Sequence, residues 1–435
     1  MDDDTGRDGG HLARTLDVAP DGALSKPRDA APDEVLSSTH DAAPGEALDN
    51  ARAAAPGGAR SGTSEAAPKG TSAWPPAKAE VRIGYLLPTR DRVVMDDRDL
   101  TSLLGQTRVA EELGFDSVWV GDSPVTRPRA DPLLVLAAAA ALTERVTLGT
   151  AVLLPALRHP ILLAHQLATL DLMSGGRLVA GMGAGFPTPN TEAQFEAVGV
   201  GFKRRVSRME EAIHAMRRLW SGDEVSFQGT HFAFNDVRLA PAPARRGGPP
   251  IWLAGGGSDS ALRRVARLAD GWLPYPPDHQ TYGTEWTSIT SERSALLTAA
   301  DDPRDTEGRH EDDAEWQDTR RPADHDAPPM KAPGDEGVRG GDPTPALYAT
   351  ICLDDDPERA RLRLRTSIER YYNAPLEVVE GIQAMFAGTH KDAAAWLQAY
   401  VDAGARHVVV RLAVDDHRAA LEEFAAHVLP LVRHA

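Results

Sequence analysis

Short apolar runs rich in branched residues alternate with longer amphipathic stretches from residue 81 to the end of the chain. This alternation is typical of βαβ units, in which crossover helices join parallel strands. Eight of the runs have the length and composition of buried strands. They cover residues 83–87, 117–120, 146–152, 178–181, 251–254, 271–273, 348–352 and 407–412.

The stretches between these runs place apolar residues at the three- and four-residue spacing of an amphipathic helix. This spacing predicts helices over residues 100–113, 132–143, 161–173, 206–220, 261–269 and 419–432. Eight strands separated by helices indicate a closed (β/α)8 TIM-type barrel over residues 81–435. Barrels place their chemistry at the carboxyl ends of the strands, so the residues that follow each strand are the candidates for a site.

One piece of the chain does not fit the alternation. Residues 224–239 contain Phe227-Gln-Gly-Thr-His-Phe232, which predicts a small β-hairpin with a glycine turn. We expect this hairpin to flank the barrel mouth and, with the loop over residues 186–202, to shape the substrate pocket.

Two segments lack the apolar residues that a core requires. Residues 1–80 are rich in Ala, Pro, Gly and Asp, and residues 298–343 are dense in charged residues, Gly and Pro. Such compositions bury too little apolar surface to offset the entropy lost on ordering. We therefore expect a disordered N-terminal tail and a disordered acidic insertion before strand seven, both on the barrel face opposite the active site.

The net charge of −17 comes mainly from these two segments. The tail has 14 acidic and 8 basic residues, and the insertion has 14 and 6. The remaining 36 acidic and 33 basic residues leave the predicted barrel almost neutral. This balance argues against a nucleic-acid partner.

Other sequence features restrict the location and the metal chemistry. No segment has the pattern of a secretion signal or the length of a membrane span, so we expect a cytoplasmic protein. The single cysteine, Cys352, excludes an internal disulfide and a thiolate cluster, and is expected to be a buried strand residue. No strand end carries the paired histidines of a metal hydrolase, so no metal site is expected.

Several strand ends carry residues suited to binding or chemistry. Asp122 and Ser123 follow strand two, and His159 comes shortly after strand three. Strand four leads into Gly181-Met-Gly-Ala-Gly-Phe186, which lacks the third glycine of a dinucleotide fingerprint and argues against a Rossmann domain.

Strand five leads through Ala254-Gly-Gly-Gly-Ser258 directly into a helix. Backbone N–H groups, a hydroxyl and a helix N-terminus converge there, which predicts a phosphate site. Tight packing is the alternative explanation for the glycines of both loops.

In their order along the chain, these motifs resemble the luciferase-like flavin-dependent oxidoreductases over residues 81–432. The motifs that carry the resemblance are Ala110-Glu-Glu-Leu-Gly-Phe-Asp-Ser-Val-Trp-Val120, Thr143-Glu-Arg-Val-Thr-Leu-Gly-Thr150, Leu170-Asp-Leu-Met-Ser-Gly-Gly-Arg177, Pro250-Ile-Trp-Leu-Ala-Gly-Gly-Gly257 and Asp270-Gly-Trp272.

The resemblance implies that reduced FMN or coenzyme F-420 lies across the barrel mouth, with its phosphate at Gly255 to Ser258. It also implies a homodimer, and a non-proline cis peptide at Thr150-Ala151 or Ala151-Val152. The residues it implies for cofactor binding are Asp122, Ala151, Val152, Gly183, Gly185, Ala254, Gly255, Gly256, Gly257 and Ser258.

The chain departs from this family at three positions. Many relatives have histidine at the position of Ser123, luciferases have a reactive cysteine at Gly183, and some deazaflavin-dependent dehydrogenases have glutamate at Phe186. Light emission is therefore not expected, and a sugar-phosphate dehydrogenase activity is disfavoured. Asp122 and His159 are the candidates for proton transfer. Ser123 is a candidate for hydrogen bonding to the cofactor ring, because a hydroxyl cannot act as a base near neutral pH.

Three functions are compatible with these residues. The leading hypothesis is a two-component monooxygenase that takes reduced FMN from a separate reductase and uses dioxygen to oxygenate a small organic substrate. The alternative is a coenzyme F-420-dependent oxidoreductase that transfers hydride on the same fold. The third is a non-catalytic flavin-binding protein.

Overall fold

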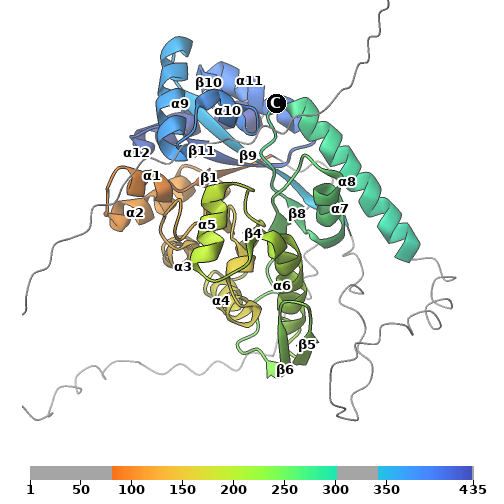
Figure 1. The fold of residues 1–435 in the computed structure, drawn as a ribbon. Coiled ribbons are helices and arrows are strands. Elements are labelled where there is room, and N and C mark those ends of the chain that lie inside the picture. The colour runs from red at the N-terminus through yellow and green to blue at the C-terminus, as the bar shows by residue number, and fades with distance from the viewer. Residues whose placement is uncertain (1–80, 301–340, 434–435) are drawn as a thin grey trace, which may run out of the picture. The chain divides into compact units, whose positions relative to one another are not determined.

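The described part of the chain is a closed barrel of eight parallel strands (Figure 1). The computed structural model describes residues 81–300 and 341–433. The last strand, β11, pairs with the first strand, β1, and so closes the barrel. The predicted fold and all eight predicted strands are confirmed. In barrel order the strands are β1 Arg82–Leu86, β2 Ser117–Val120, β3 Thr147–Thr150, β4 Leu178–Met182, β7 Ile251–Leu253, β8 Gly271–Trp272, β9 Thr344–Leu353 and β11 His407–Leu412.

Helices cover the outside of the barrel (Figure 1). Many begin at a side chain that accepts a backbone N–H, such as Asp99, Asp131 and Thr389, or carry proline in the first turn, which satisfies or removes donors that have no partner in the helix. They are α1 Thr89–Val94, α2 Leu100–Glu112, α3 Pro132–Leu142, α4 Pro160–Met173, α5 Pro189–Ala197, α6 Arg205–Leu219, α7 Asp259–Leu268, α8 His279–Ala300, α9 Pro357–Tyr372, α10 Leu376–Glu380, α11 His390–Asp402, α12 His417–His427 and α13 Leu429–Arg433, with short 3-10 turns at Pro155–Leu157 and Phe202–Arg204.

The last predicted helix is divided in two. The sequence predicts one helix over residues 419–432, whereas α12 ends at His427 and α13 starts at Leu429. Pro430 explains the break, because proline has no N–H to donate and its ring clashes with the preceding turn.

One strand was not predicted. Strand β10, Ala384–Gly388, pairs in parallel with Ala349–Leu353 in the second half of β9, whereas the start of β9 pairs with β8. Its sequence, Ala-Met-Phe-Ala-Gly, contains no β-branched residue and gives no strand pattern. β9 extends beyond the end of β8, so the backbone N–H and C=O groups in its second half have no partner in β8. Pairing with these groups decides the conformation of β10.

The predicted hairpin is present as β5 Glu224–Gln228 and β6 Ala233–Arg238. Glu211 of α6 accepts hydrogen bonds from the N–H groups of Thr230, His231 and Phe232 at 2.7 to 2.9 Å. The Phe232 ring also contacts His159 at the start of α4. The turn therefore packs outside the barrel, against helices whose N-termini face the mouth.

Two tryptophans fill the barrel interior. The rings of Trp119 and Trp252 are 5.2 Å apart and almost fully buried. A Cβ atom at Gly149 would lie 2.1 Å from the Trp119 ring, and one at Gly271 would lie 2.4 Å from the Trp252 ring. Glycines on neighbouring strands therefore make the space that these indoles occupy.

A polar group lies below these rings. His407 Nε2 and Trp119 Nε1 are both 2.7 Å from the hydroxyl of Ser117. Burial, with a contribution from Arg82, lowers the pKa of His407 to about 3, so the ring is neutral. Ser117 and His407 open their strands, which places the group on the face opposite the mouth.

The predicted tail, residues 1–80, and the predicted insertion apart from its edges lie outside the described residues. At those edges, α8 continues to Ala300, past the predicted boundary at 298, and β9 starts at Thr344. Cys352 is fully buried in β9 as predicted, and burial raises the pKa of its thiol to about 11. Within residues 81–300 and 341–433, no helix combines the length and the apolar character that crossing a membrane requires.

Candidate active site at the barrel mouth

The carboxyl end of β3 bulges at the mouth of the barrel. The peptide bond between Ala151 and Val152 is cis, which confirms the predicted position of a non-proline cis peptide. The Thr150 hydroxyl and the Leu153 N–H both donate to the Gly181 carbonyl, at 2.6 and 2.8 Å. Ala151 and Val152 pack on the apolar cluster inside the barrel and remain partly exposed. They form a floor for the mouth.

Glycines let neighbouring groups approach this floor closely. A Cβ atom at Gly121 would lie 3.3 Å from the Ala151 carbonyl oxygen, and one at Gly183 would lie 2.7 Å from Val152 Cγ2. Gly185 has a φ of +87°, which disfavours any side chain. The loop after β4 thus needs its glycines for close approach of the backbone.

Asp122 lies at this floor, and its carboxylate is engaged in the protein. Its side chain is 2% exposed. Arg158 donates to both oxygens, at 2.5 and 3.1 Å, and the Leu154 N–H donates to one of them at 3.0 Å. These contacts fasten the end of β2 to the segment after the bulge and favour a positioning role over proton transfer.

Ser123 anchors the loop after β2. Its hydroxyl donates to Oε1 of Gln194 in α5 at 2.8 Å and accepts the Arg127 N–H at 3.1 Å. The same Gln194 oxygen accepts the N–H groups of Val125 and Thr126. The serine that replaces a histidine in this chain thus orders the loop.

His159 lies outside the mouth. Its Nδ1 accepts the Ile161 N–H at 3.3 Å and caps α4, and its ring edge faces Phe232 of the hairpin turn. Burial and the nearby Arg208 lower the pKa of His159. The structure thus supports the capping explanation for this residue more than proton transfer.

The predicted phosphate segment, Ala254 to Ser258, is an exposed turn that enters α7. Gly255 and Gly257 have φ values of +141° and +71°, and the Trp272 indole donates to the Gly255 carbonyl at 2.7 Å. The Ser258 hydroxyl caps the helix by accepting the Ala261 N–H. Because Gly256, Gly257 and Ser258 are exposed, a ligand can reach their N–H groups.

A carboxylate already contacts this turn. Oε1 of Glu285, in α8, accepts the Gly257 N–H, and a Cβ atom at Gly256 would lie 2.6 Å from the other oxygen. Burial raises the pKa of Glu285, which is 9% exposed. The Gly257 N–H thus already donates to a carboxyl oxygen, as it could to an oxygen of a phosphate. No sequence motif indicates this contact, because Glu285 lies within the next helix, α8, and not in the glycine-rich segment.

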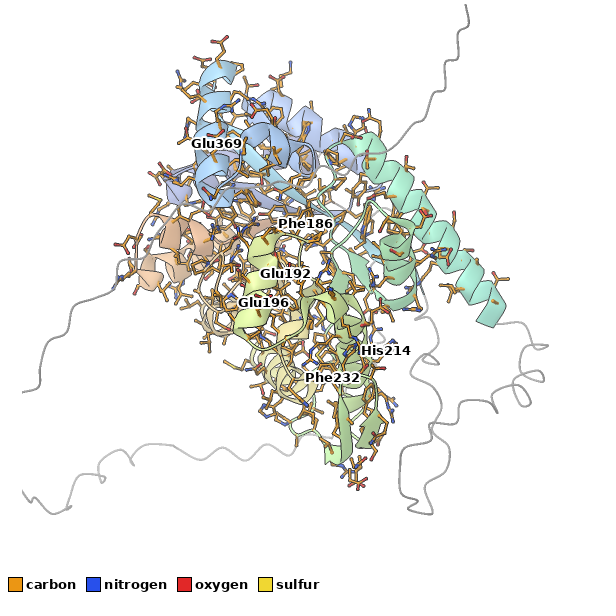
Figure 2. All side chains as sticks on the ribbon, in the orientation of Figure 1. Phe186, Glu192, Glu196, His214, Phe232 and Glu369 are labelled. Atoms are coloured by element: carbon orange, nitrogen blue, oxygen red, sulfur yellow. The ribbon has the colours of Figure 1, made fainter. Side chains whose placement is uncertain are left out.

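Aromatic residues surround the rest of the mouth. Tyr275, after β8, is near Phe186 and near Tyr348 of β9, with ring centroids 6.5 and 6.4 Å apart. Figure 2 labels Phe186 close to the start of α5. Burial, with a contribution from Tyr372, raises the pKa of Tyr275 to about 12, so its phenol remains protonated at neutral pH. Neither tyrosine lies in a sequence motif that indicates a site.

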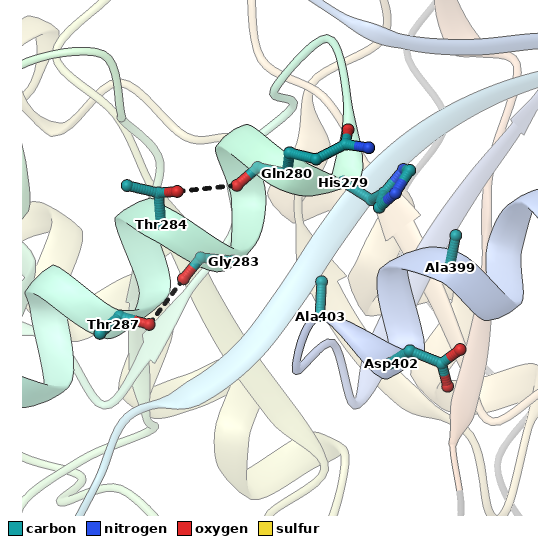
Figure 3. Close-up of a pocket in the computed structure, with 8 residues that line it drawn as sticks. All are labelled: His279, Gln280, Gly283, Thr284, Thr287, Ala399, Asp402 and Ala403. Atoms are coloured by element: carbon teal, nitrogen blue, oxygen red, sulfur yellow. Dashed lines mark hydrogen bonds between the residues drawn. The ribbon is translucent and has the colours of Figure 1, made fainter.

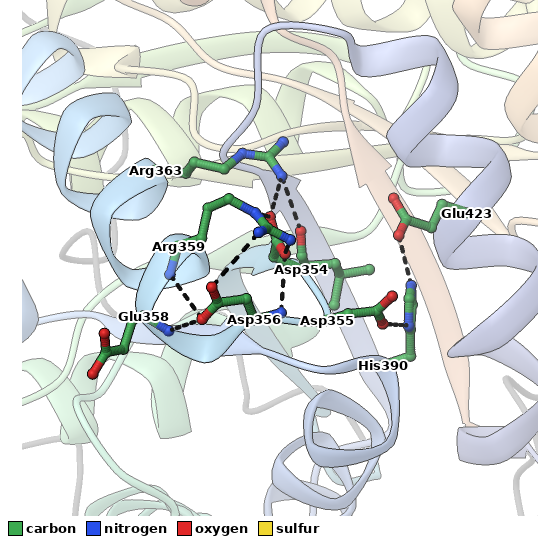
Figure 4. Close-up of polar contacts among 9 residues, drawn as sticks. Asp354, Asp355, Asp356, Glu358, Arg359, Arg363, His390 and Glu423 are labelled. Atoms are coloured by element: carbon green, nitrogen blue, oxygen red, sulfur yellow. Dashed lines mark hydrogen bonds and ion pairs between the residues drawn. The ribbon is translucent and has the colours of Figure 1, made fainter.

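Other acidic groups at the strand ends are held in ion pairs. Asp354, after β9, accepts Arg359 Nε at 2.8 Å and Arg363 Nη1 at 3.0 Å, and its hydrogen bonds to Arg359 hold its pKa well below the usual range (Figure 4). Nearby, His390 contacts Glu423. In the part of the chain that the structure describes, no cluster of three or more His, Cys, Asp or Glu side chains could hold a metal ion.

A cavity of 540 Å³ lies away from the mouth, between α8 and α11 (Figure 3). It is lined by small residues such as Gly283, Ala399 and Ala403, and the hydroxyls of Thr284 and Thr287 are satisfied by carbonyls of their own helix. It brings no set of catalytic groups together, so the site remains at the strand ends.

A sequence model described as luciferase-like monooxygenase matches residues 81–407. The chain belongs to the luciferase-like monooxygenase family. The match covers every barrel strand up to the start of β11.

Relatives within the luciferase-like family include dehydrogenases. The chain is 30% identical over 334 residues to an F-420-dependent glucose-6-phosphate dehydrogenase from Kineococcus radiotolerans, which covers 74% of this chain and 90% of the relative. Among solved structures, a monooxygenase from Streptomyces bottropensis superposes with a TM-score of 0.60 at 23% identity, over 80% of this chain and 99% of its own. An F-420-dependent secondary alcohol dehydrogenase superposes with a TM-score of 0.58 at 20% identity, over 81% and 99%. The two structures support the luciferase-like fold.

Proposed function

We propose that this luciferase-like protein is a coenzyme F-420-dependent oxidoreductase that transfers hydride between the deazaflavin and a small organic substrate. The observation that carries the proposal is the partly exposed floor that Ala151 and Val152 form at the barrel mouth, where glycines allow close approach of the backbone. The sequence alone favoured an FMN-dependent monooxygenase. The relative that is 30% identical over 90% of its own length is F-420-dependent, and it supports the alternative instead.

The residues of the mouth fit such a cofactor. Its ring would rest on Ala151 and Val152, and its phosphate would take the turn whose Gly257 N–H now binds the Glu285 carboxylate. When bound, the deazaflavin supplies a carbon that gives or accepts hydride. A backbone N–H beside a helix N-terminus suits a phosphate, because it offers a donor and a favourable dipole without a counter-charge.

The chain's own side chains then orient the substrate and exclude water. The protonated Tyr275 can donate a hydrogen bond to a substrate oxygen, and Tyr348 lies beside it. We do not carry over the glucose 6-phosphate activity of the relative. The family resemblance implies a histidine at the position of Ser123 in many members and a glutamate at the position of Phe186 in some deazaflavin-dependent dehydrogenases, and this chain has neither. A homodimer in the cytoplasm stays part of the proposal, and a flavin reductase is needed only by the monooxygenase alternative.

The test is a fluorescence titration of the protein with coenzyme F-420 and with FMN. The variants Ser258→Asp and Ser258→Asn both keep a residue that caps α7, and they differ by one negative charge. We expect wild type to bind F-420 more tightly than FMN. Ser258→Asp should weaken F-420 binding by at least about tenfold, because the new carboxylate repels the phosphate.

Ser258→Asn is the matched control and should bind F-420 within about threefold of wild type, since it caps the helix without charge. Tighter binding of FMN than of F-420 would return the assignment to the monooxygenase. Binding of neither cofactor would leave the fold without this function.

A further inference from the structure

Two arginines extend from the loop after β2 over the barrel mouth. Arg127 lies over the Tyr372 ring, 5.5 Å from its centroid, and Arg129 lies over the Tyr371 ring at 5.9 Å. A third arginine, Arg90 of α1, lies over the Tyr371 ring, 5.1 Å from its centroid. Helix α1 and the loop after β2 thus bring these three guanidinium groups to the two tyrosines at the end of α9.

No carboxylate neutralises these groups. Within residues 81–300 and 341–433, neither Arg127 nor Arg129 forms an ion pair with an acidic side chain. Asp122 attracts Arg129 electrostatically, but both of its oxygens are occupied by Arg158. Arg90 is 9% exposed and donates its Nε to the Tyr371 carbonyl at 2.8 Å. It too forms no ion pair with an acidic side chain of the described residues.

The cations influence one another. The pKa of Arg90 is lowered, first by burial and further by Arg129 and Arg127. Unpaired guanidinium groups held close together repel each other, and an anion placed between them would relieve that repulsion.

The loop that carries two of them is ordered before any ligand arrives. The Ser123 hydroxyl accepts the Arg127 N–H, and the Gln194 side chain accepts from Ser123 and from two further N–H groups of the loop. Each of the two guanidinium groups also lies over a tyrosine ring. A preorganised site of this kind binds without the entropy loss of ordering long side chains.

This group lies next to the cofactor floor. A Cβ atom at Gly121 would lie 2.1 Å from Arg129 Nη1 and 3.3 Å from the Ala151 carbonyl oxygen. The guanidinium and the cis bulge therefore flank the same small space above the end of β2. An anion bound by Arg129 would lie at the edge of a ring that rests on Ala151 and Val152.

We propose that Arg127 and Arg129, with Arg90 behind them, bind an anionic group of the substrate, a carboxylate or a phosphate, beside the reacting ring. The inference rests on the proposed function, since it needs the ring on the floor of the mouth. Arginine offers paired N–H donors that match two oxygens of either group. The substrate class is thus a small anionic molecule whose oxidisable or reducible carbon lies close to its charge.

The experiment is a calorimetric titration with inorganic phosphate and, separately, with acetate, in the presence of saturating coenzyme F-420. The cofactor fills the turn at Gly257, so that this second anion site does not contribute. If the protein does not bind F-420, the titration is made on the Ser258→Asp variant, in which the added charge blocks that turn. The two designs distinguish a protein that does not bind F-420 from one that lacks the anion site at the arginines.

The variants are the double substitution Arg127→Gln with Arg129→Gln, the double substitution to Lys, and Arg98→Gln as control. Arg98 is 91% exposed and contacts only the exposed Asp96, at 3.7 Å. We expect wild type to bind at least one of the two anions. The glutamine pair should weaken that binding at least about tenfold, the lysine pair should restore part of it, and the control should not change it.

The comparison of the two anions distinguishes a phosphate-bearing substrate from a carboxylate-bearing one, and either preference supports the proposal. Wild type that binds neither anion, or a glutamine pair that binds as well as wild type, would overturn it. A loss of F-420 affinity in the glutamine pair equal to the loss of anion affinity would also overturn it, because the arginines would then hold the cofactor. Thermal unfolding of each variant checks that the fold is kept.

Discussion

Asp122 connects two strands of the barrel through a single carboxylate. It accepts Arg158 on both oxygens and the Leu154 N–H on one of them, and its side chain is almost completely buried. A buried carboxylate of this kind stabilises the fold through its ion pair. If the carboxylate is removed, the Arg158 guanidinium stays buried without a counter-charge, which destabilises the protein. The shape of the bulge and the stability of the fold therefore depend on the same residue.

We expect Asp122→Asn to lower the free energy of unfolding by about 2–4 kcal/mol, because Arg158 loses its buried partner. Asp131 also contacts Arg158, at 3.7 Å, but its side chain is 44% exposed and it caps α3. Asp131→Asn keeps the cap and should cost less than about 0.5 kcal/mol. Denaturant unfolding followed by circular dichroism compares the two variants, and equal losses would contradict the assigned role of Asp122.

Glu285 competes with a phosphate for the Gly257 N–H. Its pKa is raised by burial, so it loses its charge at a higher pH than an ordinary glutamate does. We expect Glu285→Gln to tighten F-420 binding by about three- to tenfold at neutral pH, since one nearby negative charge is removed. In wild type the affinity should rise as the pH falls toward and through the raised pKa, because protonation removes the same charge.

This pH dependence should be absent in Glu285→Gln. Fluorescence titrations from neutral pH down to about the ordinary glutamate pKa of 4.3 measure both effects. Weaker binding by Glu285→Gln than by wild type would mean that Glu285 supports the turn rather than competing for it.

At the scale of strands and helices, the barrel depends on matched large and small residues. Trp119 and Trp252 fill the interior because Gly149 and Gly271 on adjacent strands provide the space. β10 shows the converse dependence, since its residues carry no strand pattern and pair because β9 extends beyond β8. Packing and open hydrogen-bonding partners thus decide what local propensity does not.

We expect Gly149→Ala to destabilise the protein by about 1–3 kcal/mol, because its Cβ would overlap the Trp119 ring. Gly105 of α2 is the matched control, since no atom lies within 4 Å of its added Cβ and alanine favours helix. Gly105→Ala should be neutral or stabilise by up to about 1 kcal/mol. Thermal unfolding gives both values, and a neutral Gly149→Ala would show that the indole moves aside at no cost.

At the scale of the whole molecule, the candidate site lies on one face of the barrel, and the chain enters and leaves the described part on the other. The floor, the phosphate turn and the arginines all follow the carboxyl ends of strands, whereas β1 begins, α8 ends and β9 begins on the other face. Arg293, in the second half of α8, donates its Nε to the carbonyl of Gly341 at 3.1 Å, so the chain re-enters the described part beside α8.

We therefore expect the protein to tolerate replacement of residues 301–340 by a Gly/Ser linker of about ten residues. Arg293 lies about 10 Å before the end of α8 at 1.5 Å per helical residue, a distance that such a linker spans. The F-420 affinity should stay within about twofold of wild type, because loops on the opposite face of a barrel do not enter the active site. A larger loss of affinity in a normally folded variant would place part of the binding site in residues 301–340.

The amino-acid pattern by itself determined the barrel, its eight strands and the hairpin. These features follow from hydrophobic periodicity and from turn motifs, in which the residues that interact are close in the chain. The resemblance to the luciferase-like family implied the cis peptide, at one of two adjacent bonds. Gly181 to Phe186 and Ala254 to Ser258 could be singled out in the same way, because each loop lies within one strand-to-helix connection.

Only the tertiary structure decided how the candidate side chains are used. Asp122 forms an ion pair with Arg158, and Ser123 donates a hydrogen bond to Gln194. Glu285, in the next helix, accepts a hydrogen bond from the phosphate turn. Arg127 and Arg129, after β2, lie over the rings of two tyrosines of α9, more than two hundred residues away in the chain. Hydrogen bonds and charge balance between such distant residues leave no periodicity in the sequence, because they depend on which strand ends the closed barrel brings together.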